Sequence, residues 1–186
     1  AGKPMHAWNS RDHHLRFLYD TLQRPTHLLV RQGSGPERLA ERMVYGEAHP
    51  DALARNLRGR AYQHYDGAGV DTTEQYDFKG NLLLRSRQFA SSYQQQVDWT
   101  PLAQLLDVAA IASTAVPLLE IERFTSSATY DALNRPVTLT TPDQSVVRPV
   151  YNEANLLEQA SVNLRGATTA TPFVSDIDYD AKGQRE

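Results

Sequence analysis

The chain of 186 residues contains no cysteine. Disulfide bonds, thiolate metal sites and cysteine nucleophiles are therefore excluded. No apolar run reaches the ~18 residues that a membrane-spanning helix needs. The 19 basic and 22 acidic residues leave a net charge of −3, so charge gives no support for nucleic acid or an anionic membrane as a partner.

The chain also lacks the short motifs that carry catalysis. No Gly-x-Ser-x-Gly elbow surrounds a serine, and the glycine-rich loop at residues 33–37 lacks the Gly-Lys-Ser/Thr ending of a phosphate loop. Two clusters have the residue types of metal ligands, namely His6, Asp12, His13 and His14, and Asp176, Asp178 and Asp180. Neither has the spacing of an established metal motif. We predict a non-enzymatic chain without cofactor or metal.

What the chain does have is a recurring tyrosine motif. Six of its nine tyrosines are followed by Asp or Asn, and five of these six copies carry Gly or Asn at the fifth position. The motif residues are Tyr19 and Asp20; Tyr65, Asp66 and Gly69; Tyr76, Asp77 and Gly80; Tyr130, Asp131 and Asn134; Tyr151, Asn152 and Asn155; Tyr179, Asp180 and Gly183. The exception at the fifth position is Gln23, whose turn we expect to differ from the others.

A repeated β-hairpin explains this motif. The tyrosine ends one strand, Asp or Asn bonds to its own backbone to begin a turn, and the fifth residue takes a positive φ before the next strand. Each tyrosine ring is then expected to pack over the next strand and fix its register, although a tyrosine ladder that binds sugar or extended peptide stays open. The spacing of 21 residues between Tyr130 and Tyr151 fits two strands and two turns.

The repeats divide the chain into four expected segments. Residues 1–14 form a polar N-terminal segment for which disorder is one outcome, and residues 15–97 form the first repeat sheet. Residues 98–120 form a helical insertion, and residues 121–186 form a second repeat sheet that we expect to be truncated at its end. Within the insertion, Thr100 as N-cap and Pro101 at the first position predict a helix over residues 101–112, which Pro117 cannot extend.

Three stretches of the chain resemble YD repeats of the Rhs family: residues 76–83, 130–137 and 179–185. The longer passage over residues 56–99 resembles, more narrowly, the shell-forming region of bacterial insecticidal Tc-toxin B components and SpvB-linked Rhs proteins. The resemblance implies a mainly β fold, an antiparallel sheet of β-hairpins and meanders that forms a segment of an Rhs-type β-shell. It also implies a structural role in a virulence-associated toxin complex, as wall around an encapsulated toxin.

The resemblance further implies partners and a location. The partners are the flanking repeats of the same polypeptide, the C-type and A-type components of a Tc toxin, and the enclosed toxin polypeptide. The location is secreted, or bacterial extracellular or cell-associated. The residues leave a second function open, an extracellular YD-repeat adhesin module that binds carbohydrate or protein.

Overall fold

The computed structural model describes residues 2–186, so Ala1 of the expected N-terminal segment lies outside it. The strands are β1 (His6–Trp8), β2 (His13–Tyr19), β3 (Pro25–Gln32), β4 (Arg38–Tyr45), β5 (Ala61–Asp66), β6 (Gly69–Tyr76), β7 (Leu82–Phe89), β8 (Phe124–Tyr130), β9 (Pro136–Thr140), β10 (Val146–Tyr151), β11 (Leu157–Asn163) and β12 (Thr171–Val174). One α-helix, α1 (Val108–Ala115), and 3-10 turns at Gly46–Ala48, Thr100–Leu102, Val116–Leu118 and Leu164–Gly166 complete the structure.

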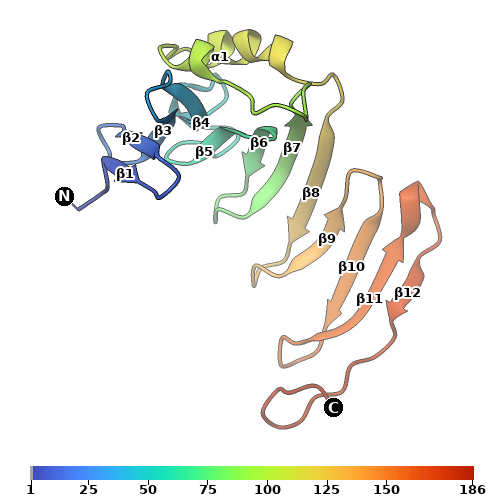
Figure 1. The fold of residues 1–186 in the computed structure, drawn as a ribbon. Helices are drawn as coiled ribbons and strands as arrows, with labels where there is room; N and C mark the ends of the chain where they lie inside the picture. Colours follow the sequence, from blue (N-terminus) through green and yellow to red (C-terminus); the bar gives the residue numbers. More distant parts are fainter. Residues whose placement is uncertain (1) are drawn as a thin grey trace. The chain divides into compact units, whose positions relative to one another are not determined.

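The twelve strands follow their order in the sequence, and each is hydrogen-bonded to the next (Figure 1). Among the described residues β1 and β12 each have a single neighbour, so the sheet is not closed. The expected mainly β, antiparallel meander with one short helix is confirmed. Two compact units divide the chain: Ala1–Gln75 with Ser86–Arg123, and Tyr76–Arg85 with Phe124–Glu186.

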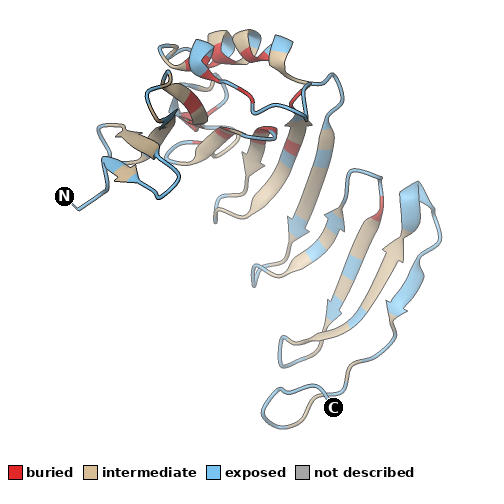
Figure 2. Cartoon of the chain, in the orientation of Figure 1, coloured by how far each residue is buried: buried red, intermediate tan, exposed pale blue. Residues whose placement is uncertain are grey.

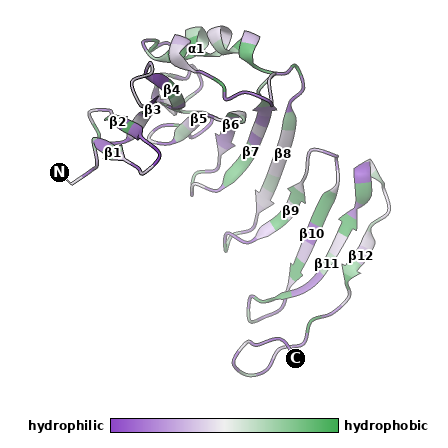
Figure 3. Ribbon diagram, viewed as in Figure 1, coloured by the Kyte–Doolittle hydropathy of each residue, from purple (hydrophilic) through white to green (hydrophobic). Residues whose placement is uncertain are grey.

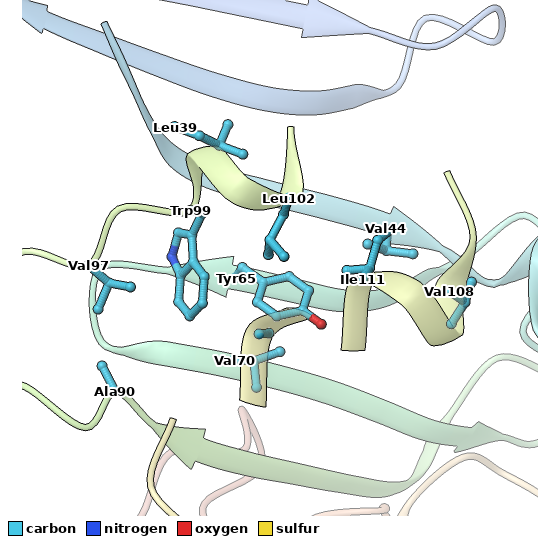
Figure 4. Packing of buried hydrophobic residues seen from close by; sticks show 11 residues of the cluster. Leu39, Val44, Tyr65, Val70, Ala90, Val97, Trp99, Leu102, Val108 and Ile111 are labelled. Atoms are coloured by element: carbon cyan, nitrogen blue, oxygen red, sulfur yellow. The ribbon is translucent and has the colours of Figure 1, made fainter. Parts of the chain in front are cut away.

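The first unit has a hydrophobic core between one face of its sheet and the segment that carries α1. Trp99, Leu102 and Ile111 come from this segment, and all three are fully buried. They pack against strand residues that include Leu39 and Tyr65, as Figure 4 shows. Burial of these apolar side chains stabilises the unit by about 25 cal/mol per Å² of apolar surface removed from water.

The second unit has no such core. None of its apolar side chains is buried (Figure 2), and Leu139 of β9 is 36% exposed. The strand register aligns Ala128, Leu139, Val147 and Val162 across β8 to β11, so they lie on one face of the sheet. This apolar row has no cover in the described part of the unit.

The opposite face of the second unit is rich in hydroxyl groups. Thr129 lies opposite Thr138, and their hydroxyl oxygens are 2.7 Å apart. Because side chains alternate between the faces of a strand, Val137 and Leu139 of β9 lie on one face and Thr138 and Thr140 on the other, and β9 has both green and purple stretches in Figure 3. The second unit is therefore a single-layer sheet with an apolar row on one face and hydroxyl groups on the other.

The helix lies further along the chain than the sequence predicts. The expected helix over residues 101–112 is wrong in position: α1 begins at Val108, and its N-cap is Asp107, whose Oδ1 accepts the N–H of Ala110 at 2.8 Å. Thr100 begins only a 3-10 turn. Its hydroxyl oxygen accepts the N–H of Leu39 at 3.0 Å, so contact with β4 takes the oxygen that would cap a helix.

The N-terminal segment is ordered where disorder was one expected outcome. Residues His6–Trp8 form β1, which pairs with β2. The rings of His6, Trp8 and His14 are stacked, with centroids 5.0 Å apart for Trp8 and His14. Stacking across the two strands and the backbone ladder hold this segment on the sheet.

Candidate functional site

Five of the six tyrosine motifs form the same turn. In each, the Asp or Asn after the tyrosine donates its N–H to the carbonyl of the residue four positions later, at 2.9–3.0 Å. Its side-chain Oδ1 accepts the N–H of that same residue at 2.8–3.0 Å. The five residues are Asp20, Asp77, Asp131, Asn152 and Asp180. Each turn therefore closes on the side chain that the motif supplies.

Backbone donors favour the charged form of Asp131. The N–H of Arg135 is the largest influence and holds the pKa of that carboxyl below its usual value. The carboxylate is thus an acceptor for its own turn.

The fifth residue of each of these turns has a positive φ. The angles are 63° at Gln23, 99° at Gly80, 64° at Asn134, 65° at Asn155 and 76° at Gly183. The expectation that the turn of Gln23 differs is therefore wrong. The left-handed conformation is accessible to a residue without a β-branch when the surrounding bonds require it.

The motif that departs from the pattern is the one at Tyr65. Here β5 and β6 are joined by a two-residue turn, because Asp66 pairs directly with Gly69. The carboxylate of Asp66 is bound by Arg87 through two hydrogen bonds of 2.6 and 2.9 Å. The ring of Tyr65 is 1% exposed and lies edge-on to Trp99, so this copy serves the core of the first unit.

A further turn has the same geometry without the motif. Thr141 donates its N–H to the carbonyl of Ser145 at 3.0 Å, and Gln144 has a φ of 64°. Thr141 stands where the other copies have Asp or Asn, so this turn lies outside the tyrosine motif. The 21-residue spacing between Tyr130 and Tyr151 was the available signal, because it requires a second turn.

Three tyrosine hydroxyls each join one turn to the turn before it. Tyr151 donates to the carbonyl of Pro136 at 3.2 Å, and Tyr179 donates to that of Leu157 at 2.6 Å. Both acceptors lie six residues after the preceding motif tyrosine. Tyr45 makes the equivalent bond to Pro25, six residues after Tyr19, at 3.0 Å. Tyr45 is therefore a repeat tyrosine that the sequence motif does not include, because Gly46 follows it where the motif has Asp or Asn.

The residue after the fifth position adds a second link. Arg135 binds Asp131 of its own turn at 2.7 Å, and its guanidinium lies 4.8 Å from the ring centroid of Tyr151 in the next copy. It also donates to Oδ1 of Asn155 at 2.7 Å. We call this set of contacts the turn clasp. In it, the residue after the fifth position binds the aspartate of its own turn and also contacts the next copy.

The turn clasp recurs elsewhere with changes of residue. Arg24 binds Asp20 at 2.7 Å and lies 3.9 Å from the ring centroid of Tyr45. Asn81 binds Asp77 at 2.8 Å and donates to Asn134 at 2.9 Å. Arginine on an aromatic face is stabilising by about 0.5–1 kcal/mol at exposed sites. The tyrosines and aspartates of the motif therefore connect neighbouring repeats.

The clusters with metal-ligand residue types do not form a metal centre. Residues 2–186 contain no group of three or more side chains placed to hold a metal ion. His6 Nδ1 and His14 Nε2 are 2.8 Å apart, but Nδ1 of His14 is buried without a partner. A metal on Nε2 would place a proton on that unpartnered nitrogen, whereas metal-binding histidines almost always donate it to an acceptor.

The positive φ of the turns gives a direct prediction for Gly80. Gly80→Val should lower the free energy of unfolding by roughly 1 kcal/mol or more, because a β-branched residue is forced into the left-handed region at 99°. The matched control is Gly80→Asn, which copies the residue at the same place in the next repeat, Asn134. Urea unfolding of the three proteins measures the difference. Equal stability of the Val and Asn variants would contradict this account of the turn.

We compared the chain with protein families, curated proteins and solved structures. No protein-family model matches the chain, and no curated protein matches it. Solved structures do match: a crystal structure of TcdB2-TccC3-Cdc42 and one of TcdB2-TccC3, each with a TM-score of 0.86, and the Tc holotoxin pore of Photorhabdus luminescens, with a TM-score of 0.85. Each is 23% identical over 99% of this chain.

The chain spans 8% of the length of each of these proteins. At this identity the likeness shows the fold, and it confirms the structural resemblance to Tc-toxin B and C components. No helix in residues 2–186 has the length and apolar character to cross a membrane.

Proposed function

We propose that the chain is a non-enzymatic wall segment of a Tc-type, toxin-encapsulating shell. The observation that carries the proposal is the second unit, a single-layer sheet whose apolar row is uncovered and whose strands match a Tc-toxin component throughout. A sheet of this kind is stable as part of a larger closed wall, because closure removes unpaired strand edges and neighbouring chain covers apolar surface.

The hydroxyl bonds of the motif tyrosines support a wall role for them. Tyr19, Tyr65, Tyr151 and Tyr179 all donate their hydroxyls to oxygens of this chain. These hydroxyl protons are therefore already used within the chain and are not offered to a sugar. The geometry therefore favours the wall over the adhesin. The binding experiments below distinguish the two functions.

The partners and location follow from the same proposal. The segment joins flanking repeats of the same polypeptide, and the complete shell works with C-type and A-type Tc components around an enclosed toxin polypeptide. Such a complex acts in virulence outside the producing cell or at its surface. Neither nucleic acid nor a cofactor has a part in it.

Two binding experiments on the 186-residue chain test this function. We expect tight association with the repeats that flank it in its parent polypeptide, measured by pull-down and calorimetry, and no signal on a glycan array. A matched pair of variants, Tyr151→Phe and Tyr151→Ala, separates the roles of hydroxyl and ring. The adhesin function would be supported, and the wall function contradicted, if the parent chain bound a glycan, both variants lost that binding, and the chain had no affinity for the flanking repeats.

A further inference from the structure

A buried arginine without an acidic partner lies beneath the segment that covers the first unit. Arg42 of β4 is 6% exposed, and its Nη2 donates to the carbonyl of Leu105 at 3.0 Å. Its Nε is buried without a hydrogen-bond partner, and no carboxylate of residues 2–186 forms a salt bridge with it. A buried cation of this kind is costly unless neighbouring groups accept its protons.

His27 of β3 lies opposite Arg42 and is one of these neighbours. Arg42 Nη1 lies 3.0 Å from Nδ1 and 2.6 Å from Nε2 of the ring. Arginine only donates, so its contact of 2.6 Å requires a lone pair on Nε2. The proton of a neutral ring then lies on Nδ1, 2.9 Å from the hydroxyl oxygen of Thr26, and the carbonyl of Ala103 lies 3.1 Å from Nε2.

The other charged groups around His27 reinforce this protonation state. Burial is the largest cause that lowers the pKa of His27, to about 4, and the charges of Arg42 and of Arg16 on β2 add to it. Glu41 and His64 line, with His27, an apolar hollow of about 220 Å³. They form their own pair, with His64 Nε2 and Glu41 Oε2 3.2 Å apart.

We propose that His27 and Arg42 form a pH-sensitive latch that holds residues 98–107 on the sheet. Neutral His27 accepts from Arg42 at Nε2, and Arg42 donates to the carbonyl of Leu105, so the pair joins two strands to the covering segment. Protonation places an N–H at Nε2 against the guanidinium. The two cations then repel each other, the grip is lost and the segment over Trp99 and Leu102 opens. This latch does not depend on the shell function.

The latch acts in a defined pH range. The pKa of His27 lies near 4 in the folded chain and near 6.5 when the ring is free, so the folded segment favours the neutral ring. The stabilisation is complete above pH 6.5 and is lost as pH falls from 6.5 towards 4. Aspartates such as Asp131 have lowered pKa values, so their stabilisation is lost at more acidic pH, as it falls below about 4.

Hydrogen exchange of the amides in residues 98–107 tests the latch. After correction for intrinsic rates, we expect their exchange to accelerate by at least about tenfold between pH 7 and pH 4.5. His27→Gln, which stays neutral, should abolish the acceleration, and the control His13→Gln should retain it. The same pH profile in His27→Gln and the parent would overturn the proposal.

A second variant keeps the test decisive if His27→Gln does not fold. Arg42→Met removes the cation and retains an apolar side chain of similar length. The pH midpoint of opening should then move upward, because the charge of Arg42 no longer adds to the effect of burial that lowers the histidine pKa. An unchanged midpoint would show that Arg42 takes no part in the latch.

Discussion

Gly69→Ala is expected to destabilise the chain by about 3 kcal/mol or more, because two separate costs combine at one residue. A Cβ on Gly69 would lie 2.1 Å from the carbonyl oxygen of Gln88 and 2.8 Å from Cα of Phe89. Both are backbone atoms, which cannot turn aside as a side chain can. The φ of 137° adds strain for any residue with a Cβ.

The control for this variant lies in the same hairpin. Gly67 has nothing within 4 Å of the position that a Cβ would take, so Gly67→Ala should leave stability nearly unchanged. Urea unfolding of both variants against the parent chain measures the difference. A Gly69→Ala protein with the midpoint of the parent would refute the close approach of β6 to β7.

Trp99→Ala is expected to cost about 3–5 kcal/mol, the usual range for removing a buried tryptophan. The side chain of Trp99 is completely buried, lies edge-on to Tyr65 and donates its indole N–H to the carbonyl of Asp66 at 2.9 Å. Loss of the ring leaves a cavity between the covering segment and the sheet, and it removes the hydrogen bond to the carbonyl of Asp66.

Two further substitutions separate these contributions. Trp99→Phe keeps most of the apolar volume and loses the N–H, so it should cost clearly less than Trp99→Ala. Trp8→Ala removes the other tryptophan, which is 71% exposed, and should have a small effect on global unfolding. Thermal and urea unfolding followed by far-UV circular dichroism gives all four stabilities. If Trp8→Ala proved as damaging as Trp99→Ala, the core would have been assigned to the wrong residues.

The turns could be predicted from sequence because their bonds are local. Asp131 binds the backbone of Arg135 four residues away, and the left-handed residue Asn134 lies between them. All the atoms that define the turn are thus encoded within one motif. The same argument explains why Gln23 was judged wrongly. Once Asp20 has closed its turn, the bonds fix the backbone of the fifth residue whatever its side chain.

The helix position and the hidden repeat tyrosine could not be predicted in this way. Thr100 has the chemistry of an N-cap, but its oxygen accepts from Leu39, 61 residues earlier. Tyr45 lacks the aspartate of the motif, and only the distance from its hydroxyl to Pro25 shows its role. Contacts between residues far apart in sequence decided both cases.

By itself, the sequence determined that the chain is a meander of β-hairpins with a repeated aspartate-led turn. Only the tertiary structure decided how the copies are used: Tyr65 in a core beneath Trp99, and Tyr151 in a clasp on an uncovered sheet. The physical reason is that a turn closes through bonds within five residues, whereas burial depends on which distant segment covers a strand. In the first unit that segment is residues 98–118, and in the second unit the described chain supplies none.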